Sequence, residues 1–279
     1  RLLVLPGEDG AVAGALFGMA GERSGQSPLE TGALARKLPE GDWRFTGTPS
    51  EPELAALGVL LGGYAFTRYR KADAHDIGFV VPDGVDAEAV ERRADAVFLA
   101  RDLINTPTSD MGPAALEEAA RTLAGRHGAS VAVTAGDALL DENFPMIHAV
   151  GRAAAEAPRL IDLSWGSEGA PKVTLVGKGV CFDTGGLDIK PASGMLLMKK
   201  DMGGAANVLG LAHMVMGAGL KMRLRVLIPA VENAISAGAF RPGDVLASRK
   251  GTSVEIGNTD AEGRLILADA LAYGDEEET

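Results

Sequence analysis

The sequence has little of several residue types, and each shortage excludes a class of protein. Its single cysteine, Cys181, excludes an intrachain disulfide framework and is typical of a reducing compartment. No apolar run approaches the ~20 residues that a membrane helix needs, and the first residues lack the basic, apolar and small-residue layout of an export signal. We therefore expect a cytoplasmic protein that has no membrane partner.

Basic residues are scarce relative to acidic ones. Lys and Arg number 27 against 38 Asp and Glu, which gives a net charge of −11. A surface of this sign repels phosphate backbones, and the sequence has no basic stripe, so nucleic acid is not expected as a partner. The 279 residues are 46% hydrophobic, which is enough for a sizeable core, and this length predicts about two domains.

Nucleophile and zinc patterns based on histidine are also missing. No pair of the four histidines has the spacing of a zinc site. His127 ends a predicted helix, where a cation interacts favourably with the helix dipole, and His213 lies among apolar residues and is predicted to be packed. Cys181 has no evident histidine partner and is predicted to be a small core residue. The lack of a GxSxG sequence excludes an ordinary α/β-hydrolase.

Short apolar runs punctuated by 37 glycines and 14 prolines indicate an α/β protein. In the second part of the chain, runs with little alternation are separated by helical patterns, which predicts a mixed or parallel sheet covered by helices on both faces. The strands expected there are 130–136, 146–151, 159–166, 172–179 and 222–231, and the helices are 114–128, 203–220 and 263–274.

A long helical pattern over 85–107, which Pro107 ends, separates the two parts of the chain. We place the domain boundary within this helix, with a small α/β domain over 1–97 and a second domain over 98–279. In the first domain we expect strands over 1–6 and 76–84 and a helix over 53–66.

Polar residues gather in two short segments, 176–206 and 255–271, which together hold the acids Asp183, Asp201, Asp260 and Glu262. Carboxylates packed together repel one another unless cations neutralise them. Oxygen-rich sites suit hard divalent ions and also accept Zn²⁺. A pair of such ions can activate a water and polarise a carbonyl or phosphoryl oxygen, and a nearby lysine can stabilise the oxyanion. The segments therefore predict dinuclear hydrolysis.

Simpler interpretations of these residues stay open at this point. If 258–264 is extended, Asp260, Glu262 and Arg264 project to the same side, but Asp260 could instead cap the final helix. Lys178 follows a glycine and could bind a phosphate, although the P-loop pattern fails because no Ser or Thr follows. A dinuclear phosphatase would share the carboxylate pattern.

Two motifs in these segments closely resemble those of the leucine aminopeptidase family of cytosolic dinuclear metallopeptidases. They are GKGVCFDTGGLDIKP followed by MKKDMGGAA, and NTDAEGRLILADAL, which contains the family's octapeptide NTDAEGRL unbroken. The upstream DLINTP and AVGRAA stretches are similar to the family's interdomain helix and the start of its catalytic domain. The resemblance covers residues 98–279 and extends to the first domain only by position.

The resemblance implies a metal site and its ligands. It implies that Lys178 is a ligand through a neutral amine. It also implies that Asp183 and Glu262 are carboxylates at the bridge between two ions. Asp201 and Asp260 are then terminal ligands. An amine must lose its proton to coordinate a metal, so the metals and burial must lower its pKa. The implied cofactors are two divalent ions, Mn²⁺ or Zn²⁺.

The remaining roles follow from the same resemblance. Lys190 corresponds to the catalytic lysine that polarises the scissile carbonyl, and Arg264 corresponds to an arginine that holds a bicarbonate acting as general base. Met198 corresponds to a residue that lines the substrate pocket together with Lys190. The implied activity is removal of a leucine-like N-terminal residue from peptides with a free N-terminus by a water that two metals activate.

The resemblance also implies the architecture and the assembly. It predicts a macro-type α/β domain followed by a mixed-sheet catalytic domain, in a homo-hexamer. The family's catalytic domain continues past the octapeptide, so we expect the catalytic domain here to be incomplete at its C-terminus. Thr184 replaces the family's serine in FDSGG and keeps the hydroxyl. The alternative hypothesis is an inactive truncated homologue that acts as a scaffold or regulatory subunit.

Overall fold

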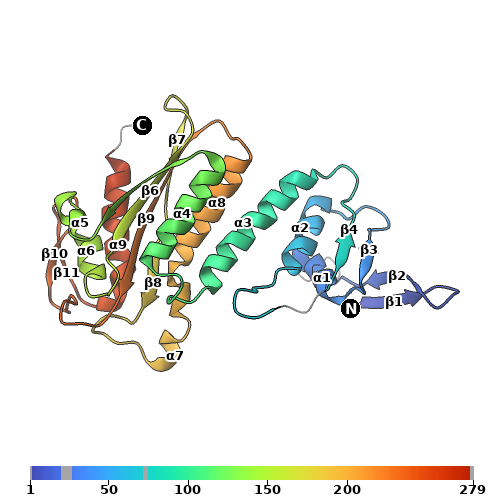
Figure 1. Cartoon of the computed structure of the whole chain (residues 1–279), viewed down its shortest axis with the longest axis horizontal. Coiled ribbons are helices and arrows are strands. Elements are labelled where there is room, and N and C mark those ends of the chain that lie inside the picture. Colours follow the sequence, from blue (N-terminus) through green and yellow to red (C-terminus); the bar gives the residue numbers. More distant parts are fainter. Residues whose placement is uncertain (1, 20–26, 72–74, 277–279) are drawn as a thin grey trace. The chain divides into compact units, whose positions relative to one another are not determined.

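The computed structural model describes residues 2–19, 27–71 and 75–276, and the order of its elements is shown in Figure 1. The chain forms two compact units, Arg1–Phe98 and Leu99–Thr279. Each unit has its own hydrophobic core. In the described residues, no helix is long and apolar enough to cross a membrane.

In the residues that the structure describes, the first unit combines short sheets with short helical segments. Its strands are β1 (Leu2–Pro6), β2 (Val12–Phe17), β3 (Gly41–Trp43) and β4 (Ile77–Phe79); β1 and β2 form an antiparallel hairpin, and β3 and β4 pair in parallel. The helical segments are the 3-10 helix η2 (Pro28–Ala33), α1 (Leu34–Lys37) and α2 (Pro52–Gly62). Glycines let η2 and α2 approach closely, because a Cβ on Gly62 would clash with the carbonyl of Gly32.

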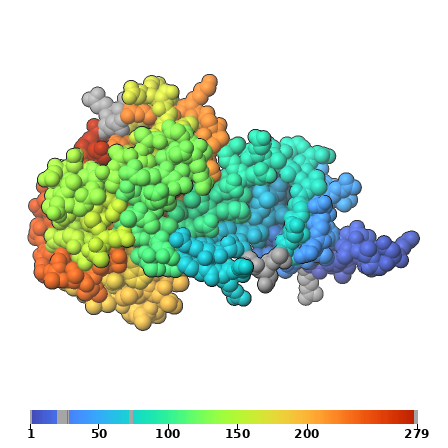
Figure 2. Space-filling model, in the orientation of Figure 1, coloured from blue at the N-terminus to red at the C-terminus, as the bar shows by residue number. Residues whose placement is uncertain are grey.

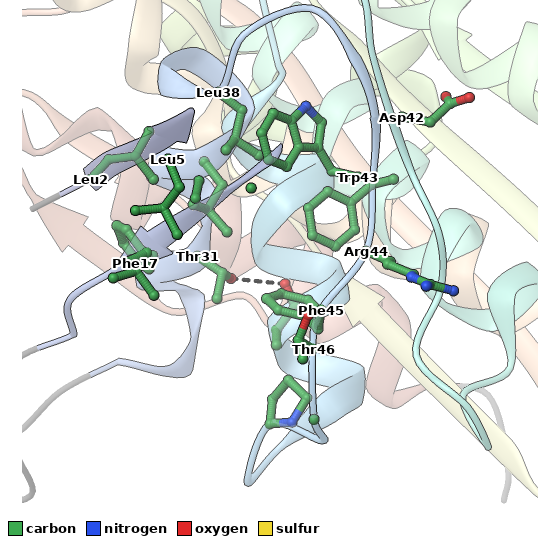
Figure 3. A pocket seen from close by; sticks show the side chains of 18 of the residues that line it. Leu2, Leu5, Phe17, Thr31, Leu38, Asp42, Trp43, Arg44, Phe45 and Thr46 are labelled. Atoms are coloured by element: carbon green, nitrogen blue, oxygen red, sulfur yellow. Dashed lines mark hydrogen bonds between the residues drawn. The ribbon is translucent and has the colours of Figure 1, made fainter. Parts of the chain in front are cut away.

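A pocket of about 1100 Å³ opens in the first unit (Figure 3). Its wall is mostly aliphatic and aromatic and includes Leu2, Leu5, Phe17, Leu38, Trp43 and Phe45. The hydroxyl of Thr31 donates to the carbonyl of Ala55 at 2.8 Å, and Figure 3 shows Asp42 and Arg44 pointing away from the apolar side chains. Polar residues, among them Glu40, Asp42, Arg44 and Glu51, also line it.

Helix α3 (Ala87–Asn105) contains the point at which the chain passes from one unit to the next. Near its start the backbone N–H of Ala89 donates to Asp86 Oδ1 at 3.1 Å. It ends before Pro107, as the sequence predicts, and the ammonium group of Lys199 donates to its last carbonyl, on Asn105, at 2.6 Å.

The second unit is built on a five-stranded mixed sheet. Its strands are β5 (Ser130–Ala135), β6 (Arg159–Trp165), β7 (Lys172–Val176), β8 (Gly179–Asp183) and β9 (Arg223–Asn233). The order is β5-β6-β9-β7, and β8 also pairs with β9. The β5-β6 and β6-β9 pairs are antiparallel, whereas β7 and β8 run parallel to β9. The predicted mixed sheet is confirmed.

Helices cover both faces of this sheet (Figure 1). Helices α4 (Pro113–His127) and α8 (Gly203–Gly217) pack on the face that carries Ile161 and Val226. Helices α6 (Pro145–Gly151) and α9 (Glu262–Asp275) pack on the face that carries Leu160 and Leu227. Neighbouring strand residues thus point to opposite cores, and the prediction of a sheet covered on both faces is confirmed.

One predicted strand is a helix. Residues 146–151 belong to α6, which begins at Pro145. A carboxylate that is distant in the sequence accepts hydrogen bonds from the first N–H groups of this helix. Asp269 Oδ2 lies 2.8 Å from the N–H of Met146 and 3.4 Å from that of Ile147, and Asp269 is fully buried. This contact caps the helix from α9, and the short apolar run of 146–151 contains no signal for it.

The remaining elements of the second unit are short. They are α5 (Ala138–Asp141), α7 (Ala192–Met195), the 3-10 helices η3 (Met198–Met202) and η4 (Thr259–Ala261), and the hairpin strands β10 (Val245–Ala247) and β11 (Ser253–Glu255).

Candidate metal centre

One acid of the first motif lies where two parallel strands, β8 and β9, end. Asp183 is the last residue of β8 and is paired in register with Asn233, the last residue of β9. Both strands therefore deliver a polar side chain to the same edge of the sheet. The carboxyl ends of strands are the usual position for ligand sites in α/β proteins.

The second motif reaches this edge as a helical turn, not as a strand. The side chain of Asn258 accepts the N–H of Asp260 at 2.7 Å, η4 follows, and Glu262 is the first residue of α9. The extended conformation considered for 258–264 is therefore wrong, because the asparagine side chain starts a turn. Asp260 does not cap α9, whose N-cap residue is Ala261.

One lysine joins acids from both motifs. Lys190 Nζ lies 2.9 Å from Asp183 Oδ2 and also contacts Asp260 Oδ1. Burial lowers the pKa of Lys190, but its hydrogen bonds to Asp260 and Asp183 outweigh this effect and hold the pKa above its ordinary value. Burial raises the pKa of Asp183, but hydrogen bonds from Lys190, the Gly185 N–H and Asn233 outweigh it, so the net pKa is lowered.

A second lysine lies between the other two acids. Lys178 Nζ is 2.8 Å from Asp201 Oδ2 and 2.8 Å from Glu262 Oε1. Burial lowers the pKa of Lys178, and its close contacts with Asp201 and Glu262 raise it more, so the net pKa is raised. Burial is also the main reason that the pKa of Glu262 is raised, with the charges of Asp183 and Asp201 adding to it and Lys178 opposing it.

Two glycines make room for the Lys178 side chain and its backbone. A Cβ on Gly263 would lie 2.8 Å from Lys178 Nζ, and a Cβ on Gly204 would lie 2.8 Å from the Lys178 backbone nitrogen. The Lys178 carbonyl accepts the N–H of Ala205 at 2.9 Å. The first turns of α8 and α9 can therefore both approach this lysine.

The donor set fits divalent metal ions. Ligand atoms of Asp183, Asp260 and Glu262 lie within 4.8 Å of one another. Glu262 Oε2 is buried and makes no hydrogen bond to any residue that the structure describes, whereas Asp201 Oδ2 and Glu262 Oε1 share the ammonium group of Lys178. Buried carboxylate oxygens without donors are costly, and a cation satisfies them. Four carboxylates against two ammonium groups also leave an excess of negative charge for divalent ions to balance.

Two of the predicted site residues stay apart from this cluster. Arg264 is the third residue of α9, and its exposed side chain forms no hydrogen bond or ion pair within the described ranges. Met198 is half-buried at the start of η3. The adjacent Leu196 and Leu197 are 78% and 58% exposed, and the gold-coloured segment that carries them lies at the surface in Figure 2.

Three residues that connect the two motifs, Asn233, Thr259 and Asp188, were not predicted as part of the site. Asn233 is 1% exposed, and its amide group donates to Asp183 Oδ1 at 2.8 Å and to the carbonyl of Thr259 at 3.1 Å. Thr259 is fully buried, and its N–H donates to Asp188 Oδ2 at 2.7 Å. A polar residue at the end of an otherwise apolar strand was the signal that could have identified Asn233.

The histidines and the cysteine form no part of this cluster. His127 Nε2 lies 2.8 Å from His213 Nδ1, a contact that the sequence did not predict. Cys181 is fully buried in the core shared with α4 and α8, and burial raises the pKa of its thiol, so the prediction of a core cysteine is confirmed.

Comparison with known proteins extends these observations over the whole chain. Residues 98–279 match the catalytic domain of the cytosol aminopeptidase family, and residues 1–82 match the N-terminal domain of M17 aminopeptidases. A probable cytosol aminopeptidase of Geobacter sp. (strain M21) is 44% identical over 239 residues, which are 81% of this chain and 49% of that protein. The chain thus spans about half the length of the curated relatives it matches.

Solved structures agree with the sequence comparison. The cytosol aminopeptidase of Coxiella burnetii is 46% identical with a TM-score of 0.92, over 98% of this chain and 60% of that one. The bottromycin maturation enzyme BotP, in a complex with Mn, is 34% identical with a TM-score of 0.88, over 100% of this chain and 64% of that one. The family resemblance and the predicted α/β class of both domains are confirmed.

Proposed function

The chain belongs to the cytosol aminopeptidase family. From this premise we propose that it is part of a metal-dependent aminopeptidase. The substrates are peptides with a free N-terminus, and the residue removed is leucine or a similar one. The observation that carries the proposal is the pair of lysines that separate four carboxylates, which come from β8, η3, η4 and α9.

Five side chains are proposed to hold two divalent ions, Mn²⁺ or Zn²⁺. Asp183 and Glu262 are the most buried acids of the cluster, and they would hold the ions together with Lys178, Asp201 and Asp260. When bound, such ions polarise the scissile carbonyl and lower the pKa of the attacking water. Mn bound to BotP supports Mn²⁺ as the first ion to test.

Lys190 is proposed to act directly on the substrate. Its raised pKa keeps the side chain protonated, and an ammonium group can donate a hydrogen bond to the scissile carbonyl oxygen as negative charge develops there. Its side chain is 15% exposed, so water competes little for this contact. Ligation of Asp183 and Asp260 to metal ions would release the ammonium group for that role.

Arg264 is proposed to bind a bicarbonate ion, and Met198 is proposed to contact the substrate. The exposed guanidinium of Arg264 has a planar set of donors that fits a bicarbonate ion, which would supply a general base when bound. Met198, half-buried beside the exposed Leu197, is proposed to line the pocket for the N-terminal side chain of the peptide, with Lys190 at its polar end.

We also propose that the protein acts in the cytoplasm as a homo-hexamer. The cytosolic relatives support the location. Mass photometry at nanomolar protein concentration tests the assembly, since a single species of one-subunit mass would overturn the hexamer.

Release of a chromophore from leucine p-nitroanilide tests the activity. The protein is assayed after metal removal, then with Mn²⁺ or Zn²⁺, alongside the N-acetylated leucine anilide as the matched substrate control. Metal-dependent cleavage of the free-amine substrate alone is the expected result. An absence of turnover with either metal would favour the scaffold hypothesis, and equal cleavage of the acetylated substrate would exclude a requirement for the free amine.

A further inference from the structure

Thr259, which directly precedes the proposed ligand Asp260, is held from several directions at once. Its N–H donates to Asp188 Oδ2 at 2.7 Å, and its hydroxyl accepts the N–H of Asp188 at 2.8 Å. The same hydroxyl donates to the carbonyl of Gly185 at 2.6 Å. Its carbonyl accepts a hydrogen bond from the Asn233 amide at 3.1 Å. Thr259 is therefore fully hydrogen-bonded and fully buried.

These bonds join segments that are 71 residues apart along the chain. Asp188 lies two residues before Lys190, and Thr259 lies one residue before Asp260, so the Asp188–Thr259 bonds fix the separation of Lys190 and Asp260. A two-point contact through an N–H and a hydroxyl also fixes the orientation of the turn, which a single bond would leave free.

Asn233 adds a third segment to the same contact. Its amide nitrogen donates to Asp183 Oδ1 at 2.8 Å as well as to the Thr259 carbonyl. At 1% exposure it cannot exchange these partners for water. The packing is tight, because a Cβ on Gly186 would lie 2.9 Å from Thr259 Cβ and 3.1 Å from Asn233 Oδ1.

We propose that Asp188 and Asn233 are positioning residues, which hold Thr259 between them and thereby set Asp260, Asp183 and Lys190 for metal binding and catalysis. This inference rests on the proposed function for the roles of those three residues. Partners that orient metal ligands in this way typically change metal affinity or activity by about 10–100-fold when removed.

Replacement of Asp188 separates positioning from general stability. Asp188→Ala removes the acceptor, whereas Asp188→Asn keeps an oxygen that can accept the Thr259 N–H. Asp162→Asn is the matched control, because it weakens the Asp162–Arg225 ion pair of 2.6 Å elsewhere in the second unit. Asn233→Asp, which keeps the shape but places a carboxylate against Asp183, tests the other side of the contact.

The first measurement is hydrogen–deuterium exchange of the metal-free protein, followed in peptides that cover 255–262. Asp188→Ala is expected to raise the exchange at Thr259 and Asp260. The exchange rates of Asp188→Asn are expected to stay near those of the original protein. Unchanged exchange in Asp188→Ala would overturn the proposal, because the turn would then be held without that side chain.

The second measurement is the Kd for Mn²⁺ by titration calorimetry with the full chain. Asp188→Ala and Asn233→Asp are expected to weaken it about tenfold or more, and Asp188→Asn is expected to restore it. An equal loss in Asp162→Asn would overturn the proposal, since the effect would then follow from lower stability alone. A Kd unchanged in Asp188→Ala would overturn it as well.

Different results would refute the proposed function and the positioning role of Asp188. If the unsubstituted protein binds no Mn²⁺ and cleaves no free-amine substrate, the proposed function fails, and the exchange experiment still decides whether Asp188 positions the turn. If the unsubstituted protein binds and cleaves but Asp188→Ala matches it in exchange, Kd and turnover, only the positioning role fails.

Discussion

The ammonium group of Lys178 lies 2.8 Å from Oε1 of Glu262, a carboxylate whose side chain is only 1% exposed. Lys190 has a similar position beside Asp183 at 2.9 Å. Without metal ions, the two lysines balance part of the negative charge of the acidic cluster. Metal binding must therefore replace these ion pairs, and the loss of a proton from Lys178 makes the metal affinity dependent on pH.

Glu262→Gln should separate metal binding from folding. Burial raises the pKa of Glu262, so its ionised form costs stability as the pH rises above the ordinary value of 4.5. An amide removes that cost and can still accept from Lys178, so the metal-free free energy of unfolding should change by less than about 1 kcal/mol. The increase in Tm that Mn²⁺ causes should be lost.

The control for this prediction is Glu255→Gln, at an exposed position of β11. It should keep both the metal-free stability and the response to Mn²⁺. Thermal unfolding with and without Mn²⁺ measures both quantities. If Glu262→Gln keeps the full response to Mn²⁺, Glu262 is not a ligand.

Lys190→Ala should strongly lower turnover while the protein still binds Mn²⁺. Loss of one donor to a developing oxyanion typically lowers kcat by about 10²–10³-fold, and removal of the ammonium leaves Asp183 and Asp260 without a competing cation. The Kd for Mn²⁺ should therefore stay the same or decrease. Lys250→Ala, which breaks an exposed ion pair with Asp275, is the control. Near-full turnover in Lys190→Ala would refute its catalytic role.

The strands of the sheet were predictable because their residues are apolar on both faces. Leu160 and Ile161 point into different cores, and a run of this kind is typical of a strand covered on both sides. Residues 146–151 have the same apolar character but form α6. The decisive contact is from Asp269, 123 residues away from Met146, and no local pattern contains it.

The candidate site was predictable in its residues but not in its geometry. Acids of both motifs lie close together, since ligand atoms of Asp183, Asp260 and Glu262 lie within 4.8 Å of one another. The extended conformation considered for 258–264 is wrong, although Asn258 followed by Thr259 and Asp260 is a local signal for a turn closed by the asparagine side chain. The role of Asn233 depends on strand register, which places it beside Asp183 and which a sequence alone does not specify.

Gly263→Ala should show that helix propensity alone does not determine how replacement of a glycine by alanine changes the stability of this fold. Alanine is favoured over glycine in a helix by about 1 kcal/mol, and Gly125 in α4 has open space for a Cβ. Gly125→Ala should therefore raise the free energy of unfolding by about 0.5–1 kcal/mol. At Gly263 the new Cβ would lie 2.8 Å from Lys178 Nζ and displace the ammonium group.

The expected result for Gly263→Ala is no gain in stability and a weaker Kd for Mn²⁺. Urea unfolding and titration calorimetry of Gly263→Ala and Gly125→Ala give the comparison, with Gly125→Ala expected to leave the Kd unchanged. Stabilisation of Gly263→Ala equal to that of Gly125→Ala, with an unchanged Kd, would show that Lys178 does not need that space.

The contact between His127 and His213 should make the stability of the second unit depend on pH. Their nitrogens are 2.8 Å apart, so one ring must donate and the other must accept, and the accepting ring is neutral. Burial, together with the charge of Arg126, holds the pKa of His127 below 6.5. The unfolded chain then binds more protons than the folded one around that pH, so stability falls as the pH falls below about 6.5.

His127→Gln keeps a donor for His213 but does not titrate, so its Tm should fall less between about pH 7.5 and about pH 5.5 than that of the original protein. His75→Gln, at an exposed position, should keep the original pH dependence. Equal slopes in all three proteins would mean that the His127–His213 contact does not control stability in this range.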